Sequence, residues 1–443
     1  MSKDTTLETR MYIWELFQSN YTDQQIADKV GYSVPTVRKW RRRVQQQGRE
    51  GLVSKMGRPR TGALSSFPEA LREDIRYRRD EHPGWGPDTL VVEIGRDPYW
   101  IGKRHPSRSS IARYLREQNL TREYERNTEV PQAKCKVAKE PHDVWELDAR
   151  GEQYIAEVGV VALINVKDIC SRARLLSLPA VLGKHRRQRH PNTEDYQMAL
   201  RLAFTDWGLP GQVHVDHASV FIDNTSKSPF PSRFHLWLTA LGIDLTFSRR
   251  HRATDQGAVE RSHQTWAAQV LQGQKFDSWE ALYFALRERR EVLNCSLPCA
   301  TLDGLPPLLA FPYAIHSGRH YRPEWEADLL DMNRVFNYLR QGHWFRRVSK
   351  DGSISLGHNI MSVGRKLAHQ QLEVKVHPEE HSCLCFNATG DIVAHCRPRK
   401  LTKEYLMGHV GTVFNLPFFQ LALPFPGEAE QVIRLFRTIG VTT

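Results

Sequence analysis

Apolar residues recur at helical spacing in residues 22–46, TDQQIADKVGYSVPTVRKWRRRVQQ. Two apolar helix faces follow from this spacing, one formed by Ile26, Ala27 and Val30 and the other by Val34, Val37, Trp40 and Val44. Thr22 and Gln25 form a capping box at the start of the first helix. Gly31 permits a tight turn, and Ser33 is a favourable N-cap for the second helix. The pattern therefore predicts a helix-turn-helix.

The second helix of this pair has a polar and basic face. The side chains that we expect to point outward are Thr36, Arg38, Lys39, Arg42 and Arg43. A recognition helix contacts bases through residues near its N-terminus, and further arginines suit phosphates. An amphipathic helical hairpin with a solvated basic face would also explain these charges. The capping box, the glycine turn and the basic helix together favour a DNA-binding domain over residues 1–56.

Residues 67–125 show a similar arrangement. PDTLVVEI predicts a helix after GWG, and PSRSSIARYLREQNL predicts a second helix with Ser107 as its N-cap. Ile111, Tyr114 and Leu115 are expected to pack inward. Arg108 and Arg113 then point outward, which suggests a second helix-turn-helix-like DNA-binding domain. Together with the first unit it would read a long DNA site in two parts.

Two polar segments separate these units from each other and from the rest of the chain. Residues 57–66 form a basic linker in which Arg58 and Arg60 suit a narrow minor groove. The alternative is a solvated linker that touches only phosphates. Residues 126–142 form a second, charged linker that runs past Pro141.

From residue 143 the pattern changes to short apolar strands. DVWELDARG, VGVVALINVKD and ARLLSLPAV predict three strands, and TEDYQMALRLAFTDW predicts a helix after them. GQVHVDHAS and IDLTFSR predict two more strands, each followed by a helix, FHLWLTALG and DQGAVERSHQTWAAQVLQ. Three strands, helix, strand, helix, strand, helix is the order of a ribonuclease H-like α/β fold. We assign this core to residues 143–310.

The C-terminal part begins with a predicted connector helix over residues 311–343. Residues 344–402 contain short alternating segments with turn signals between them, which predict a small β-barrel. A DNA contact, an assembly surface and a simple packing module are all open as its role. Residues 403–443 form a tail with the proline-broken apolar stretch NLPFFQLALPFP. The tail would dock on another subunit or a helper protein, or cover the core.

Charge points to a partner for this multidomain chain. The 443 residues contain 62 Lys+Arg and 50 Asp+Glu, a formal net charge of +12 at pH 7. A basic surplus of this kind indicates a polyanionic partner, and nucleic acid is the usual one.

Cysteine spacing and hydropathy indicate the compartment. The seven cysteines form no paired CxxC arrangement, so a zinc site is not expected and a reducing cytosol fits. The first residues, MSKDTTLETR, lack the apolar region of a signal peptide, and no apolar run reaches the length of a membrane span. We expect a cytoplasmic protein without a membrane partner.

Three carboxylates occupy notable positions in the core. Asp148 lies within an apolar strand, Asp216 ends the fourth strand and Glu260 lies on the last helix. Burying a carboxylate is costly unless it is paired or bound to a metal. Hard oxygen ligands suit Mg²⁺, and two such ions serve phosphoryl transfer. The alternative is three solvated or salt-bridged acids.

Other acids near this set have simpler explanations. Asp168 follows the second strand and is interpreted as a structural turn residue. Asp255 would cap the helix that bears Glu260. Glu146 lies on the same strand face as Asp148 and could help to hold Asp148 in place without binding the metal itself.

The segments WELDARG, INVKDICSRARL, VHVDHASVF and QGAVERSHQ resemble those of integrase-core (DDE) transposases of bacterial insertion sequences, in the retroviral integrase superfamily. The resemblance implies that Asp148, Asp216 and Glu260 bind two Mg²⁺ ions, which Mn²⁺ can replace. It also implies binding to the terminal inverted repeats of a mobile element, cleavage at the 3′ ends and joining to target DNA. The family's usual Asn-Gly after the second Asp is His217-Ala218 here.

The resemblance also implies partners. Double-stranded DNA would be bound as element ends and as target, by a homo-oligomer in the bacterial cytoplasm at the nucleoid. The need for an ATPase helper protein is open. The cations nearest Glu260 are expected to hold DNA phosphates, with a solvated basic surface as the alternative. These cations are Arg249, Arg250, His251, Arg252, Arg261 and His263.

Two other function classes are compatible with parts of this pattern. A non-catalytic sequence-specific DNA-binding protein derived from a transposase would keep the N-terminal units and need no acids. A ribonuclease H-like nuclease would use the acids but would show no strand transfer. Tandem DNA-binding units together with all three acids favour the transposase.

Overall fold

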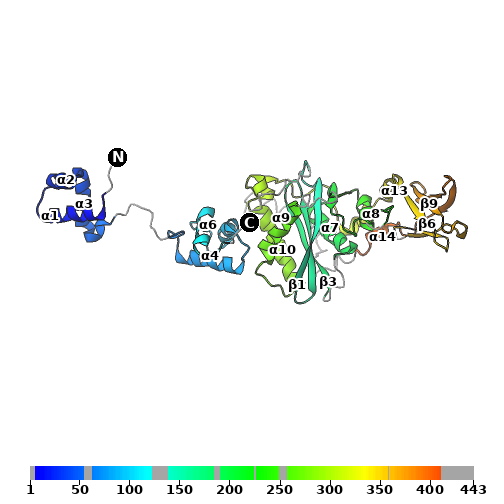
Figure 1. The fold of residues 1–443 in the computed structure, drawn as a ribbon, viewed down its shortest axis with the longest axis horizontal. Coiled ribbons are helices and arrows are strands. Elements are labelled where there is room, and N and C mark those ends of the chain that lie inside the picture. The colour runs from blue at the N-terminus through cyan, green and yellow to red at the C-terminus, as the bar shows by residue number, and fades with distance from the viewer. Residues whose placement is uncertain are drawn as a thin grey trace. The chain divides into compact units, whose positions relative to one another are not determined.

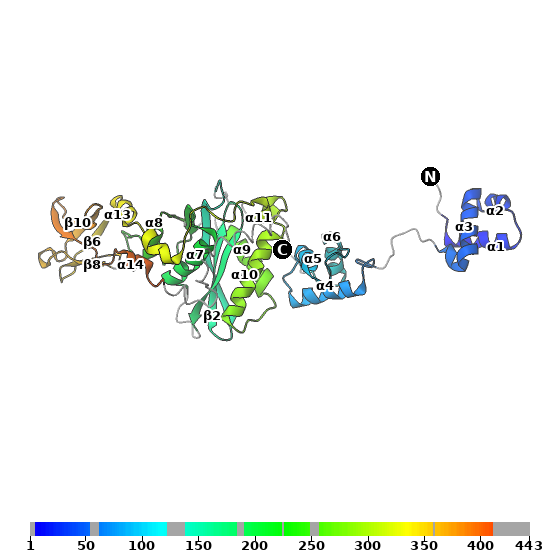
Figure 2. The ribbon, with the colours of Figure 1, turned by 180° about the vertical axis from the view of Figure 1, so that it is seen from behind.

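The structure is a computed structural model, shown from two sides in Figures 1 and 2. It describes residues 5–53, 62–121, 138–183, 190–223, 226–248, 257–357 and 359–410, with the backbone alone for Glu152, Gly183 and residues 257–261. The chain divides into two compact units, Met1–Pro68 and Glu69–Thr443. Each unit is described by itself.

The first unit contains the predicted helix-turn-helix and one helix before it. Its helices are α1 (Leu7–Gln18), α2 (Asp23–Val30) and α3 (Val34–Gln47), followed by a 3₁₀ turn, η1 (Gly48–Leu52). The capping box is confirmed, because Thr22 Oγ1 accepts from Gln25 N and Gln25 Oε1 accepts from Thr22 N at 3.0 Å. Gly31 has φ +70°, the left-handed conformation that ends α2.

The core of the first unit depends on α1, which the apolar pattern did not single out. Ile13 and Leu16 of α1 pack with the predicted inward residues of α2 and α3. The buried members from those two helices are Ile26, Ala27, Val37 and Trp40, whereas Val30 and Val34 are only partly buried. A third helix is needed because a two-helix hairpin would leave one apolar face of α3 in water.

The second unit starts with three more helices, α4 (Glu69–Glu81), α5 (Pro87–Arg96) and α6 (Arg108–Glu117). The predicted cap of α6 is confirmed, since Ser107 Oγ accepts from Ser110 N at 3.3 Å. Ile111, Tyr114 and Leu115 are buried as expected. These helices therefore form the second helix-turn-helix-like element.

The centre of the second unit is a five-stranded mixed sheet. Its strands are β1 (Val144–Ile155), β2 (Gly159–Asp168), β3 (Arg174–Gly183), β4 (Gln212–Val215) and β5 (Asp244–Phe247). They lie in the order β3-β2-β1-β4-β5, in which β1, β2 and β3 are antiparallel neighbours while β4 and β5 run parallel to β1. This order confirms the predicted ribonuclease H-like core.

Helices cover both faces of this sheet. In Figures 1 and 2, α9 (Gly257–Trp266) and α10 (Trp279–Cys295) lie on one side and α7 (Thr193–Trp207) on the other. Alternate strand residues therefore enter two cores: Trp145 and Leu147 pack with Phe204 of α7, whereas Val161 and Leu163 pack with Leu282 and Leu286 of α10. A short helix, α8 (Arg233–Ala240), joins the α7 side.

Two helices occupy the segment for which a single connector helix was expected. They are α12 (Glu326–Leu329) and α13 (Met332–Arg340), after the short α11 (Pro307–Ala310). The break falls at Asp331, whose Oδ1 accepts from Asn333 N at 2.9 Å and so begins a new helix.

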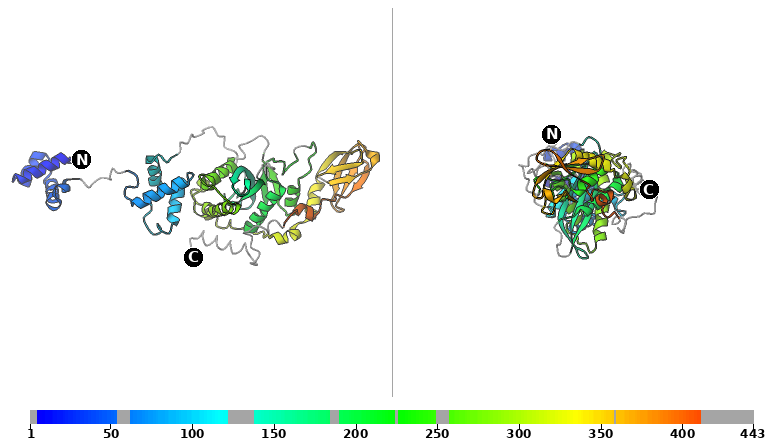
Figure 3. Two further views of the ribbon diagram at one scale, coloured as in Figure 1. Left: turned by 90° about the horizontal axis from the view of Figure 1, so that it is seen from below. Right: turned by 90° about the vertical axis from the view of Figure 1, so that its right-hand side faces the viewer.

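The C-terminal module consists of six short strands (Figure 3). They are β6 (His343–Arg347), β7 (Ser353–Leu356), β8 (Asn359–Ser362), β9 (Gln371–His377), β10 (Ser382–Phe386) and β11 (Ile392–Cys396). An antiparallel sheet has the order β11-β10-β9-β6, and β7 pairs with β8. The small β structure predicted here is confirmed. Helix α14 (Lys403–Met407) follows, and most of the predicted tail lies outside the described residues.

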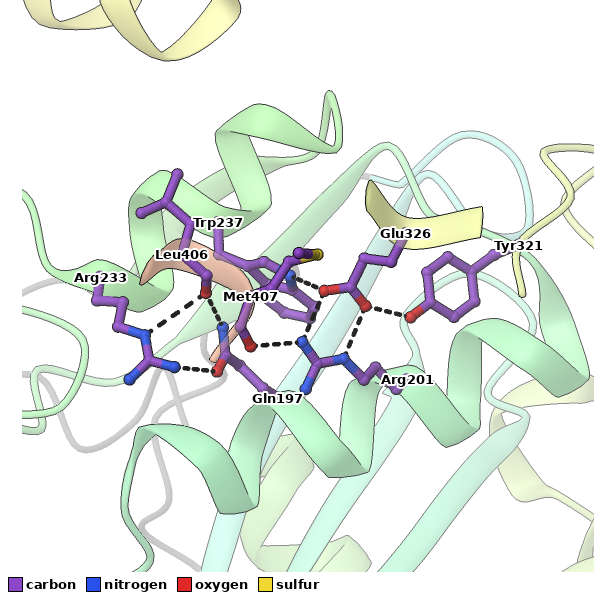
Figure 4. A network of polar contacts seen from close by, with 8 residues as sticks. All are labelled: Gln197, Arg201, Arg233, Trp237, Tyr321, Glu326, Leu406 and Met407. Atoms are coloured by element: carbon purple, nitrogen blue, oxygen red, sulfur yellow. Dashed lines mark hydrogen bonds and ion pairs between the residues drawn. The ribbon is translucent and has the colours of Figure 1, made fainter. Parts of the chain in front are cut away.

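A buried ion pair joins α12, which precedes this module, to the core (Figure 4). Arg201 of α7 and Glu326 of α12 have side chains that are 1% and 0% exposed, and Arg201 donates to both carboxylate oxygens at 2.7 and 2.6 Å. Trp237 Nε1 donates to Glu326 at 2.8 Å, and the Tyr321 hydroxyl also donates to it. Burial opposes the charge of Arg201, but Glu326 more than compensates, so the pKa of Arg201 is raised.

The same cluster holds the end of the module. Arg201 Nη2 donates to the Met407 carbonyl and Gln197 Nε2 donates to the Leu406 carbonyl, each at 2.8 Å. Two residues of α7 therefore satisfy the last carbonyls of α14 and hold the chain after β11 against the core (Figure 4).

Within the described residues, no helix has both the length and the apolar character needed to cross a membrane.

Arg201→Leu should strongly destabilise the second unit, because Glu326 would remain buried without its cation. Removing one partner of a buried ion pair costs about 3–5 kcal/mol. Urea unfolding followed by tryptophan fluorescence measures the change. Arg76→Leu is the control, since Arg76 and Asp80 form an exposed pair at 3.9 Å. An unfolding midpoint equal to that of the control would contradict this reading of the pair.

Candidate active site

Two of the three predicted acids follow a pair of neighbouring parallel strands. The parallel register of β1 and β4 pairs Val144 with Gln212 and Glu146 with His214. Asp148 comes two residues after Glu146 within β1, and Asp216 directly follows Val215, the last residue of β4. Residues two apart along a strand share a face. Asp148 is therefore on the face of Glu146, and we expect Asp216 near it at the same end of the sheet.

Local hydrogen bonds orient both acids. Asp148 Oδ1 accepts from Ala149 N at 2.8 Å, and Asp216 Oδ1 accepts from Ala218 N at 2.9 Å. Both side chains remain partly exposed. The pKa of Tyr196 is raised by burial and, next, by the charges of Asp148 and Asp216, so both acids act on one phenol. Ala218 thus provides the backbone donor for Asp216.

Helix α9 lies against β1 beside these acids. Arg150 Nη1 donates to the His263 carbonyl at 2.5 Å, and His263 Nε2 lies 3.1 Å from Asp148 Oδ2. Glu260 is three residues before His263, so the backbone places it one turn earlier on the same helix face. Its side chain lies outside the described part of the structure. The helix that carries the third acid therefore runs beside Asp148.

His263 occupies a place different from the one expected for a phosphate contact. Its side chain is 17% exposed and lies against Asp148. Burial, with a smaller contribution from the charge of Arg150, lowers the pKa of His263 to about 4. The imidazole is therefore neutral at pH 7 and adds no positive charge to a DNA-binding surface in this conformation.

A polar cavity lies beneath Asp148 and was not found from the sequence. It is lined by Glu146, Asp148, Asn165, Lys167 and Ser262. Cross-strand pairing of β1 and β2 explains the set, since Glu146 is opposite Lys167 and Asp148 is opposite Asn165. Burial and then Arg174 lower the pKa of Lys167 to about 8, and Glu146 partly opposes this shift. A lysine alternating with apolar residues in VALINVKD was the signal available.

The donor set fits Mg²⁺. Asp148 and Asp216 each accept a backbone N–H at Oδ1, Asp148 Oδ2 lies against His263, and both residues are partly exposed. Oxygen-only ligation by a few carboxylates is what Mg²⁺ accepts, because it retains waters and binds substrate phosphates. Among the side chains that the structure describes, no three His, Cys, Asp or Glu residues form a metal-binding group, and Glu260 is not one of those side chains.

Asp168 is a structural residue, as the sequence suggested. It is fully buried, its Oδ1 accepts from His142 N at 2.9 Å, and its Oδ2 accepts from Ser171 N at 2.7 Å. The bond from Ser171 stabilises the turn between β2 and β3, and the bond from His142 holds the segment before β1 against that turn.

The predicted DNA-contacting residues of the first unit lie on α3. Arg38 and Arg42 are exposed, and Arg38 Nε donates to Asp23 at 3.1 Å. Lys39 and Arg43 lie over the ring of Trp40, at 5.5 and 5.1 Å from its centroid. Thr36 is also on α3, partly buried near its N-terminus.

In the second unit, two of the predicted cations are exposed on α6. Arg108 pairs with Asp88 at 2.8 Å, and Arg113 is exposed in the second turn of the helix. The other predicted contacts lie outside the described residues. They are Arg58, Arg60, Arg249, Arg250, His251, Arg252 and the side chain of Arg261.

Both helical elements match known domain families. Residues 4–53 match a family described as a homeodomain-like domain, and residues 36–115 match another with the same description. Helix-turn-helix domains of this type suggest DNA binding.

Solved structures of retroviral proteins are similar to larger parts of the chain. A chain of the simian T-cell lymphotropic virus intasome in complex with PP2A regulatory subunit B56 gamma is 15% identical, over 54% of this chain and 74% of its own, with a TM-score of 0.31. The HTLV-2 integrase catalytic core domain in complex with magnesium (trimeric form) is 15% identical, over 40% and 97%, with a TM-score of 0.28. The catalytic core domain of BIV integrase is 17% identical, over 39% and 95%, with a TM-score of 0.27.

Arg42→Ala should weaken binding of the full-length protein to duplex DNA and flatten its salt dependence by about one unit of slope, because one phosphate contact is lost. Fluorescence anisotropy at several salt concentrations measures this slope. Arg42→Lys is the matched control, since it keeps the charge and should keep the slope. An unchanged slope in Arg42→Ala would show that α3 does not lie along the DNA backbone through this residue.

Proposed function

We propose that this protein is a DDE transposase that cuts the ends of a mobile DNA element and joins them to target DNA. The observation that supports the proposal is the parallel pairing of β1 with β4, because Asp148 and Asp216 each come two residues after the paired Glu146 and His214, and His263 of α9 lies against Asp148. An acid on that helix, Glu260, completes a set of three oxygen donors from three different elements.

The three acids would hold two Mg²⁺ ions, with Mn²⁺ as a substitute. Bound there, the metals would activate the attacking oxygen and stabilise the leaving oxygen in phosphoryl transfer. Asp148 and Asp216 contribute by their fixed orientation, since each is held by a backbone N–H. Neutral His263 lies against Asp148 Oδ2 and adds no competing positive charge there.

Two reactions at this site give cleavage and joining. Water first attacks the phosphodiester at the end of the element and frees a 3′-hydroxyl. That hydroxyl then attacks a target phosphodiester, so the element strand is joined to the target while a target 3′-hydroxyl leaves. Each bond formed replaces a bond broken, and no covalent intermediate with the protein is needed.

DNA would be recognised by the two helical units. The homeodomain-like elements present α3 and α6, and the exposed arginines on each suit phosphates and base edges. These units would read the terminal inverted repeats in two parts. Two ends must be held together for joining, so a homo-oligomer on DNA is expected. An insertion-sequence origin and a role at the bacterial nucleoid belong to the same proposal.

Asp216→Asn should reduce end cleavage and strand transfer by about a thousandfold or more, because a metal ligand contributes several kcal/mol to the transition state. Glu260→Gln should have the same effect. The assay uses the full-length protein with duplexes that carry the DNA flanking its gene. Asp244→Asn is the control. Asp244 is exposed at the first position of β5, the end of the strand away from the candidate site, so this variant should keep wild-type activity.

The same assay separates the alternatives. Cleavage that survives in both acid variants would refute the site. Tight end binding without cleavage in Mg²⁺ or Mn²⁺ would identify a DNA-binding protein derived from a transposase. Cleavage of hybrids or junctions without joining would identify a ribonuclease H-like nuclease.

Chelation should abolish end cleavage by the wild-type protein while end binding is kept, because the helical units need no metal. Addition of Mg²⁺ or Mn²⁺ should restore cleavage. Binding and cleavage are measured on the same labelled duplex. Full cleavage in the presence of a chelator would exclude the metal-dependent mechanism.

A further inference from the structure

Gln269 lies where helices α4–α6 contact the catalytic core. Its Nε2 donates to Thr89 Oγ1 at 3.1 Å, and its Oε1 accepts from Arg289 Nε at 3.0 Å. Its backbone carbonyl accepts from Trp85 Nε1 at 3.2 Å. Arg289 Nη1 also donates to Glu93 Oε1 at 2.7 Å. We call these five residues the Gln269 network.

The contact around this network is close and largely buried. A Cβ on Gly84 would lie 1.9 Å from the carbonyl oxygen of Ala268, so the two backbones meet with no room for a side chain. The Arg289 guanidinium lies 4.6 Å from the ring centroid of Trp85 and is 8% exposed. Val92 of α5 packs on the core between the sheet and α10. Buried charge pairs and a backbone contact of this kind hold two elements in one relative position.

The network acts on the end of the helix that carries Glu260. Residues Ala267–Leu271 form a π-helical turn that continues α9 directly, and Gln272 N donates to the Ala267 carbonyl at 2.8 Å. Gln269 is the middle residue of that turn. Single π-helical turns inside α-helices are frequent at functional sites. Glu260 lies nine residues earlier, which is roughly 14 Å along a helix axis.

The last turn of α9 meets the candidate site. Arg150 donates to the His263 carbonyl, and His263 lies against Asp148. One helical element therefore contacts the first acid through its last turn and the helices α4–α6 through the π-helical turn that follows. Trp266, between these two contacts, is buried in the core and ties them together.

We infer that Gln269 and Thr89 are positioning residues that couple the engagement of DNA by α4–α6 to the placement of Glu260 in the catalytic site. The inference rests on the proposed function. DNA that fixes α5 and α6 restrains Thr89, Trp85 and Glu93, and through the network it restrains the π-helical turn and α9. The site is then completed when the correct DNA is bound.

Gln269→Leu tests this coupling because it removes the side-chain hydrogen bonds to Thr89 and Arg289 and keeps the side-chain size. The variant should bind a duplex selected by the full-length protein from a random-sequence pool as well as wild type does. Cleavage of that duplex should slow by about ten- to a hundredfold, as expected when a group is misplaced by a remote change. Amide hydrogen exchange gives a second readout, since the duplex should protect residues 257–271 in wild type and not in the variant.

Gln274→Leu is the matched control. Gln274 Nε2 donates to the Glu81 carbonyl at 2.8 Å, so it belongs to the same contact but follows the π-helical turn. This variant should bind, cleave and protect α9 as wild type does. Should Gln269→Leu fold poorly, Thr89→Val and Thr89→Ser provide the comparison. Thr89→Val removes the hydroxyl, so it should slow cleavage and abolish the protection of α9 by the duplex. Thr89→Ser retains the hydroxyl, so it should cleave and protect α9 as wild type does.

Wild-type cleavage together with wild-type protection of α9 in Gln269→Leu would overturn the inference, and so would loss of duplex binding itself. Failure of the proposed function gives a different result. In that case wild-type protein neither cleaves nor joins DNA, yet the exchange measurement still decides whether DNA binding orders α9.

Discussion

The parallel pairing of β1 with β4 is the constraint on which the candidate site depends. Two carboxylates can stand side by side only where the backbone is held firmly enough to resist their repulsion. The sheet supplies that support through apolar cores on both of its faces and through backbone donors for both acids. Two like charges placed near one another are stabilised when a cation binds between them.

Helix α9 serves two parts of the molecule at once. It lies beside Asp148 through its last turn, and its π-helical extension contacts the α4–α6 helices. The predicted second DNA-binding unit is therefore packed on the core and belongs to the same compact unit. On the α7 side, Arg201 pairs with Glu326 of α12 and donates to the Met407 carbonyl at the end of α14. The second helix-turn-helix-like element and the candidate site thus share one compact unit.

Sequence patterns predicted local features well and long-range ones poorly. The capping box at Thr22 and the cap at Ser107 were predictable because each depends on neighbouring residues. The Arg201–Glu326 pair joins residues 125 positions apart, so no spacing could indicate it. His263 was interpreted as a phosphate contact because periodicity does not show which face of α9 meets β1. Lys167 was overlooked since its partner, Glu146, is on another strand.

The central claim is that Asp148 and Asp216 bind metal together, and Mn²⁺ binding measured by electron paramagnetic resonance tests it most directly. Full-length protein bound to duplex DNA is titrated with Mn²⁺, beside Asp148→Asn, Asp216→Asn and the exposed control Asp244→Asn. The account predicts that each of the two site variants weakens binding by at least about tenfold, while the control does not. Equal Mn²⁺ binding in wild type and both site variants would contradict it.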